Sequence, residues 1–114
     1  MGSEGTEKPW GTTQLICEQS NFEVHRIVIR KGAYCSKHYH KRKVNQFFVE
    51  SGALQITTFS YEATLKTTLH TKQSCIIPPG VVHSFTAIED TVAYEIYWAN
   101  RIGEDIVRLD KGMT

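Results

Sequence analysis

Long apolar runs are missing from this 114-residue sequence. None of its apolar segments approaches the roughly 18 residues that a membrane-spanning helix requires. The N-terminus also lacks the basic and then apolar order of a secretory signal. Both absences favour a soluble protein, for which we expect a cytoplasmic location and no membrane partner.

Cysteine is scarce, with residues at Cys17, Cys35 and Cys75 and no CxxC spacing. An odd number of cysteines without paired spacing favours neither a disulfide framework nor a zinc ribbon. We therefore expect three reduced thiols, mostly buried, as in a cytosolic protein.

A charge excess of either sign is also missing. The 13 Lys and Arg residues nearly balance the 12 Asp and Glu residues, which gives a formal net charge of +1. The sequence pI is about 7.8. Because a nucleic-acid-binding domain normally carries a clear basic excess, we predict no nucleic-acid partner.

No segment shows the apolar period of an amphipathic helix. Short segments typical of strands recur instead, separated by turns about every ten residues, which predicts an all-β antiparallel sandwich or barrel. We expect a disordered leader at residues 1–9 and one barrel domain at residues 10–112. The expected strands cover residues 12–17, 22–30, 44–50, 53–59, 63–70, 72–77, 83–88 and 91–98.

Two histidines lie two positions apart in a strand-like segment, at His38 and His40. Since alternate side chains of a strand share one face, both imidazoles can reach one ion. His83 follows a Pro-Pro-Gly turn at the head of another apolar strand. Three neutral imidazoles with an open position are typical of a reactive metal site, although the first pair alone also fits a solvated basic edge.

The spacing of these residues resembles the two motifs of the cupin superfamily. Residues 32–52 match the first motif around His38 and His40, and residues 78–83 match the second motif around His83. The resemblance implies a single-domain cupin, a double-stranded β-helix or jelly-roll-like antiparallel barrel. It also implies that His38, His40 and His83 bind a divalent transition metal, which the sequence leaves open among Zn, Mn, Ni, Co and Fe.

The fourth ligand position departs from the cupin pattern, because the family has Glu where this sequence has Asn45. Gln46 is the alternative amide, and only one of two neighbouring strand residues can point inward. An amide oxygen is a weaker, neutral ligand, so we expect looser metal binding than with a carboxylate.

Two flanking motifs resemble one cupin group more specifically. Lys-Pro-Trp-Gly at residues 8–11 and Gly-Glu-Asp-Ile-Val-Arg at residues 103–108 bracket the barrel, and residues 77–83 read Ile-Pro-Pro-Gly-Val-Val-His. Together they look like the C-terminal cupin domain of type II mannose-6-phosphate isomerases and mannose-1-phosphate guanylyltransferase/isomerase fusions, over about residues 8–112. The resemblance implies a metal-dependent aldose–ketose isomerisation of a phosphorylated sugar.

Arg108 matches the arginine of the family's C-terminal motif. We interpret it as a catalytic residue that contacts phosphate or an oxyanion, because a guanidinium suits such groups. Ion pairing with Glu104 or Asp105 is an equally good interpretation from spacing alone.

Two other function classes stay open. One is a three-histidine iron oxidoreductase of the dioxygenase type, and the other is a non-catalytic sugar or small-molecule binder, which Asn45 favours. In each class the partner is a small molecule, and we expect a homodimer. Residues 91–98 place Glu95 and Tyr97 on one strand face and Tyr94, Ile96 and Trp98 on the other, so a pocket wall could lie here.

Overall fold

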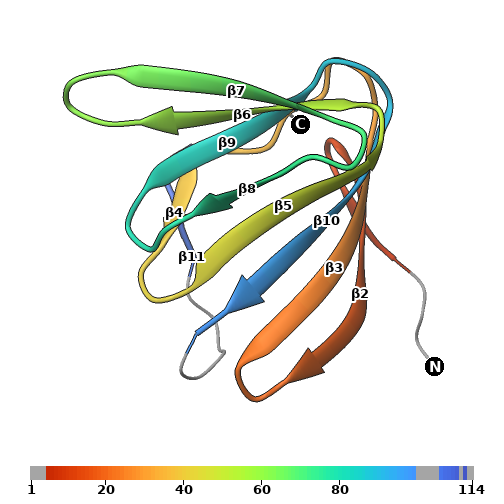
Figure 1. Cartoon of the computed structure of the whole chain (residues 1–114), viewed down its shortest axis with the longest axis horizontal. Coiled ribbons are helices and arrows are strands. Elements are labelled where there is room, and N and C mark those ends of the chain that lie inside the picture. The colour runs from red at the N-terminus through yellow and green to blue at the C-terminus, as the bar shows by residue number, and fades with distance from the viewer. Residues whose placement is uncertain (1–4, 100–105, 111, 113–114) are drawn as a thin grey trace.

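The computed structural model describes residues 5–99, 106–110 and 112, which form eleven strands and no helix. Two antiparallel sheets face each other in a barrel-like arrangement (Figure 1). The described part of the chain contains no helix that is long and apolar enough to cross a membrane. The expected all-β fold is confirmed.

Each sheet combines strands that are distant in the sequence. The six-stranded sheet has the order β1 (Thr6–Lys8), β2 (Gly11–Gln19), β3 (Phe22–Ile29), β10 (Thr91–Trp98), β5 (Val44–Ser51) and β8 (Ser74–Ile77). The five-stranded sheet has the order β11 (Ile106–Arg108), β4 (His38–His40), β9 (Val82–Ala87), β6 (Ala53–Phe59) and β7 (Thr64–His70). Because each described pairing is antiparallel, inward residues on neighbouring strands form rows that cross the sheets.

Part of the segment expected to be a disordered leader, residues 1–9, is a strand of the barrel. Thr6–Lys8 form β1, which pairs with β2 in the register Thr6 to Thr13. Residues 1–4 lie outside the described residues, so the leader stays a prediction for them. Trp10 is buried and its ring meets that of Phe85 edge-on, with the ring centroids 5.1 Å apart.

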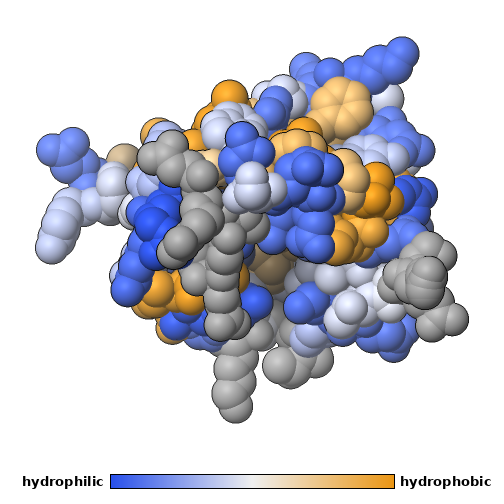
Figure 2. Space-filling model, turned by 90° about the horizontal axis from the view of Figure 1, so that it is seen from below, coloured by the Kyte–Doolittle hydropathy of each residue, from blue (hydrophilic) through white to orange (hydrophobic). Residues whose placement is uncertain are grey.

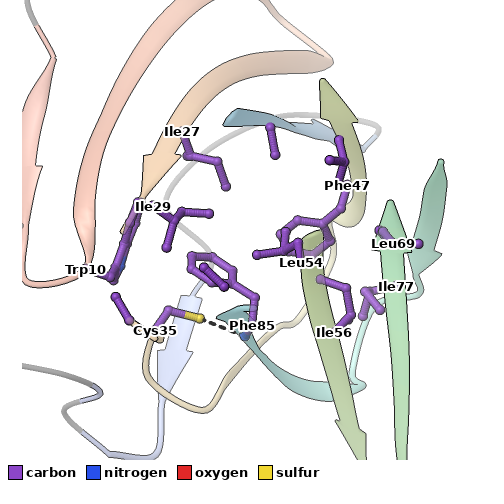
Figure 3. Close-up of a cluster of buried hydrophobic side chains, with 14 residues drawn as sticks. Trp10, Ile27, Ile29, Cys35, Phe47, Leu54, Ile56, Leu69, Ile77 and Phe85 are labelled. Carbon is purple, nitrogen blue, oxygen red and sulfur yellow. Dashed lines mark hydrogen bonds between the residues drawn. The ribbon is translucent and has the colours of Figure 1, made fainter. Parts of the chain in front are cut away.

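The hydrophobic core lies between the two sheets (Figure 3). Side chains from β3, β5, β6 and β9 point toward one another there, and the largest of them are Phe47 and Phe85. Each such side chain contributes roughly 1.5–3 kcal/mol when fully buried. Phe47 also contacts His83, at a centroid distance of 6.2 Å. The apolar core therefore adjoins the histidines.

The surface is mixed in polarity. On the face shown in Figure 2, hydrophobic residues gather in separate areas among hydrophilic ones.

The three cysteines are free thiols, as expected, and Cys35 is buried. Cys17 is exposed, contrary to the expectation of mostly buried thiols, because it lies in the second half of β2, where the residues on both faces of the strand are exposed.

Candidate metal centre

Three histidines converge at one end of the core. His38 and His40 occupy alternate positions of β4 and each is 4% exposed, while His83 on the neighbouring β9 is fully buried. His38 pairs directly with His83, and their ring centroids lie 4.4 Å apart. One ligand nitrogen from each of the three lies within 4.8 Å of the others. The expected convergence is therefore present.

The turn before β9 ties the two histidine-bearing strands together. The backbone N–H of Gly80 donates to the carbonyl of His40 at 2.7 Å. Gly80 has φ of 84°, a left-handed conformation that glycine adopts without steric cost. The Pro-Pro-Gly turn thereby fixes where β9 starts and holds His83 beside β4.

Backbone carbonyls set the tautomers of two imidazoles. His38 Nδ1 donates to the carbonyl of Ser36 at 2.7 Å, and His83 Nδ1 donates to that of Val81 at 2.9 Å. A carbonyl only accepts, so Nδ1 carries the proton and Nε2 of the neutral ring keeps a lone pair. Metal-binding histidines are commonly oriented by such outer hydrogen bonds. The donor set therefore fits a divalent transition metal.

Asn45 completes the cluster from the opposite sheet. Along β5 the buried positions are Asn45, Phe47 and Val49, whereas Gln46 is half-buried on the other face, so the amide that points inward is Asn45. Its Oδ1 lies 3.2 Å from Nε2 of His83.

With Nδ1 of His83 protonated, Oδ1 of Asn45 and Nε2 of His83 are both acceptors. They repel each other unless a cation lies between them or the amide rotates. Rotation would let Nδ2 donate to Nε2, and Nδ2 is a buried donor without a hydrogen-bond partner in the present orientation. Asn45 can thus serve as a ligand or as a hydrogen-bond donor to His83.

Burial keeps the imidazoles of His38 and His83 neutral. It lowers the pKa of His38 from 6.5 to about 3, with repulsion from His83 as the next cause. Burial also lowers the pKa of His83. Neutral imidazoles bind a metal without first losing a proton, so the site is ready for an ion at neutral pH.

The depressed pKa of His38 predicts acid sensitivity of the chelator-treated protein. Between pH 6.5 and about 3 the unfolded chain binds a proton at His38 that the folded protein does not. The free energy of unfolding therefore decreases as the pH is lowered through this window. For this one group the decrease is about 2 kcal/mol between pH 7 and pH 5. Urea unfolding of wild type and His38→Gln in EDTA at both pH values measures the difference. An equal decrease in the free energy of unfolding between pH 7 and pH 5 in the two proteins would contradict the prediction.

A cavity of about 170 Å³ opens beside His38 between the two sheets. Arg108 lines it, lies opposite His38 in the β4–β11 register, and donates through Nη1 to Oγ of Ser36 at 2.9 Å. The alternative partners Glu104 and Asp105 lie outside the described residues. The other lining residues are Lys8, Trp10, Thr13, His25, Cys35, Phe85, Glu95, Tyr97 and Ile106.

Sequence reasoning did not assign a role to Glu95 or Tyr97, which line this cavity. It placed both on one face of a strand but did not say which face points inward. Glu95 is 8% exposed, and the hydroxyl of Tyr97 donates to its Oε2 at 2.8 Å. A single charged side chain within a strand that is otherwise mostly apolar and aromatic is the signal that could have singled out Glu95.

Comparison with known proteins decides the family. The model for the C-terminal domain of mannose-6-phosphate isomerase matches residues 3–111. The chain belongs to this family. Its fold is the cupin barrel that the two histidine motifs resemble. The specific resemblance inferred from the flanking motifs is thus confirmed.

Curated relatives of this family domain are much longer proteins. The chain is 29% identical over 76 residues to a mannose-1-phosphate guanylyltransferase of Sinorhizobium fredii, covering 67% of the chain and 14% of the relative. It is 34% identical over 76 residues to the xanthan biosynthesis protein XanB of Xanthomonas campestris pv. campestris, covering 67% of the chain and 15% of the relative. The chain thus spans about a seventh of their length.

Solved structures share the fold of this family domain. KdgF from Halomonas sp. superimposes with a TM-score of 0.76 at 17% identity, covering 86% of this chain and 87% of that chain. At this identity the likeness concerns the fold alone.

Proposed function

We propose that this domain binds a divalent transition metal ion through His38, His40 and His83, with Asn45 as a neutral fourth ligand. With the ion bound, it interconverts the aldose and ketose forms of a phosphorylated sugar such as mannose 6-phosphate. The observation that carries the proposal is the pair of Nε2 lone pairs on His38 and His83, oriented by backbone carbonyls, together with the cavity with cationic walls that His38 lines. Membership of the family supports the choice of substrate.

The residues around the cavity divide the remaining tasks. A bound divalent metal supplies polarisation of the sugar carbonyl. Arg108 and Lys8 place two cationic groups on the cavity wall, which suits a phosphate dianion. The rings of Trp10 and Phe85 line the apolar side and help to exclude water from the reacting carbons.

The test combines metal analysis with a sugar-phosphate assay. Protein purified without added metal is analysed for its elements, treated with EDTA, and reloaded separately with Zn²⁺, Mn²⁺, Co²⁺ or Ni²⁺. Conversion of mannose 6-phosphate to fructose 6-phosphate should disappear with EDTA and return with at least one metal. A protein that is fully loaded with metal and converts no mannose 6-phosphate would contradict the proposed isomerase activity.

A three-histidine iron oxidoreductase is the second candidate. The neutral Asn45 is compatible with it, because three histidines without a carboxylate also suit an iron site with positions open for dioxygen and a substrate. Iron in the purified protein together with dioxygen consumption would favour this class, and the lack of any bound metal would favour plain small-molecule binding. The homodimer and the cytoplasmic location stay predictions.

A further inference from the structure

Glu95 holds a carboxyl group on the cavity wall opposite the histidine strands. It lies on β10 in the middle of the six-stranded sheet, in register with His25 of β3 and Phe47 of β5. The side chain is almost fully buried, yet it lines the same 170 Å³ cavity as His38. The carboxyl group of Glu95 and the His38 side chain of the candidate metal centre therefore line the same cavity.

Tyr97 connects this carboxyl to the histidine cluster. Its hydroxyl donates to Oε2 of Glu95 at 2.8 Å, and its ring lies 5.1 Å from that of His40 between centroids. In the strand register Tyr97 is the direct neighbour of Asn45. Tyr97 thus fixes the orientation of Glu95 relative to the metal centre.

The surroundings of Glu95 suit proton transfer. Burial raises its pKa, while the Tyr97 hydrogen bond and nearby cations act in the opposite direction. An elevated carboxyl pKa brings the group closer to the pH at which an acid–base catalyst works best. The charged and titratable groups that face it are Tyr97 from β10, His25 from β3, Lys8 from β1 and Arg108 from β11, together with Cys35.

The reaction proposed above needs a base that the metal centre lacks. The amide of Asn45 is not basic, and the protons of His38 and His83 are held by backbone carbonyls. Among the described residues that line the cavity, Glu95 carries the carboxylate.

We propose that Glu95 is the general base of the isomerisation and that Tyr97 is its positioning residue, an inference that rests on the proposed function. The carboxylate takes the proton from C2 of the aldose, the C–H pair forms the C1–C2 double bond, and the carbonyl pair moves onto O1. The carboxyl then returns the proton to C1 while the O2 proton passes to O1 and the C2 carbonyl forms. The sugar is neither oxidised nor reduced overall.

The decisive variant is Glu95→Gln in the metal-loaded chain, assayed with mannose 6-phosphate. The amide keeps an acceptor for the Tyr97 hydroxyl but cannot take a proton. We expect kcat to fall by about 100-fold or more, the range of general-base catalysis, with KM and Zn²⁺ affinity changed less than about threefold. The matched control is Glu50→Gln, because exposed Glu50 accepts a hydrogen bond from Tyr94 at 2.8 Å on the outside of the same sheet.

A second variant covers the case in which Glu95→Gln fails to fold. Tyr97→Phe removes a hydrogen bond that favours the ionised carboxylate, so the acid limb of the pH–kcat profile should move to higher pH. If the acid limb of the pH–kcat profile did not move in Tyr97→Phe, that limb would belong to a group other than Glu95. This result would overturn the proposal. Wild-type kcat in Glu95→Gln would remove Glu95 as the base and leave the isomerase intact. Lack of turnover by metal-loaded wild type would overturn the proposed function, and the role of Glu95 with it.

Discussion

His83→Ala is expected to weaken Zn²⁺ binding by at least about 100-fold, above the 10–100-fold that loss of an outer-shell partner costs. His83 is fully buried, forms the direct cross-strand pair with His38, and presents Nε2 toward Asn45. Its removal takes away one of the three imidazoles and leaves Asn45 without the group that it faces. Isothermal titration of the EDTA-treated proteins with Zn²⁺ measures the loss.

The control for this variant is His70→Ala, because His70 is an exposed histidine at the end of β7. Both proteins should keep the circular dichroism of an all-strand fold, and the control should bind Zn²⁺ as wild type does. If folded His83→Ala bound Zn²⁺ with wild-type affinity, the ion would have to bind elsewhere. The assignment of the metal centre would then fail.

Asn45→Asp is expected to tighten metal binding by about 10-fold or more, because an anionic oxygen replaces a neutral one at nearly the same volume. Without metal the same carboxylate is a fully buried charge 3.2 Å from a neutral imidazole nitrogen, so the melting temperature should fall. The increase in melting temperature on adding Zn²⁺ should therefore be larger in the variant than in wild type.

Gln46→Glu is the matched control, since it adds a carboxylate at the next position of β5 but on the opposite face. It should change neither metal affinity nor the effect of Zn²⁺ on melting. Unchanged or weaker affinity in Asn45→Asp, with a lower melting temperature, would mean that the three histidines bind without Asn45. The three-histidine oxidative and binding-only functions would then gain support.

The histidines were predictable because local rules determine their positions. A strand period of two puts His38 and His40 on one face, and the Pro-Pro-Gly turn places His83 at a strand start. The choice between Asn45 and Gln46 was not predictable from β5 alone. Both faces of that strand carry apolar side chains, so the alternation does not say which face is inside.

Glu95 was harder to assign because the more hydrophobic face of β10 is the one that points outward. The inward positions are Thr91, Ala93, Glu95 and Tyr97, whereas the more apolar set of Val92, Tyr94, Ile96 and Trp98 is half-buried on the outside. The inward face is polar here because part of it lines a cavity rather than the core. Which face of β10 points inward is determined by its pairing with β3 and β5, which are distant in the sequence.

The proposed function requires that His38, His40 and His83 together bind one metal ion. Its most direct test is a crystal structure of Co²⁺-loaded protein with anomalous data collected on both sides of the cobalt edge. We expect one anomalous peak within about 2.0–2.3 Å of a nitrogen from each of the three imidazoles. Cobalt bound at another position, with His83 turned away from the other two rings, would contradict it.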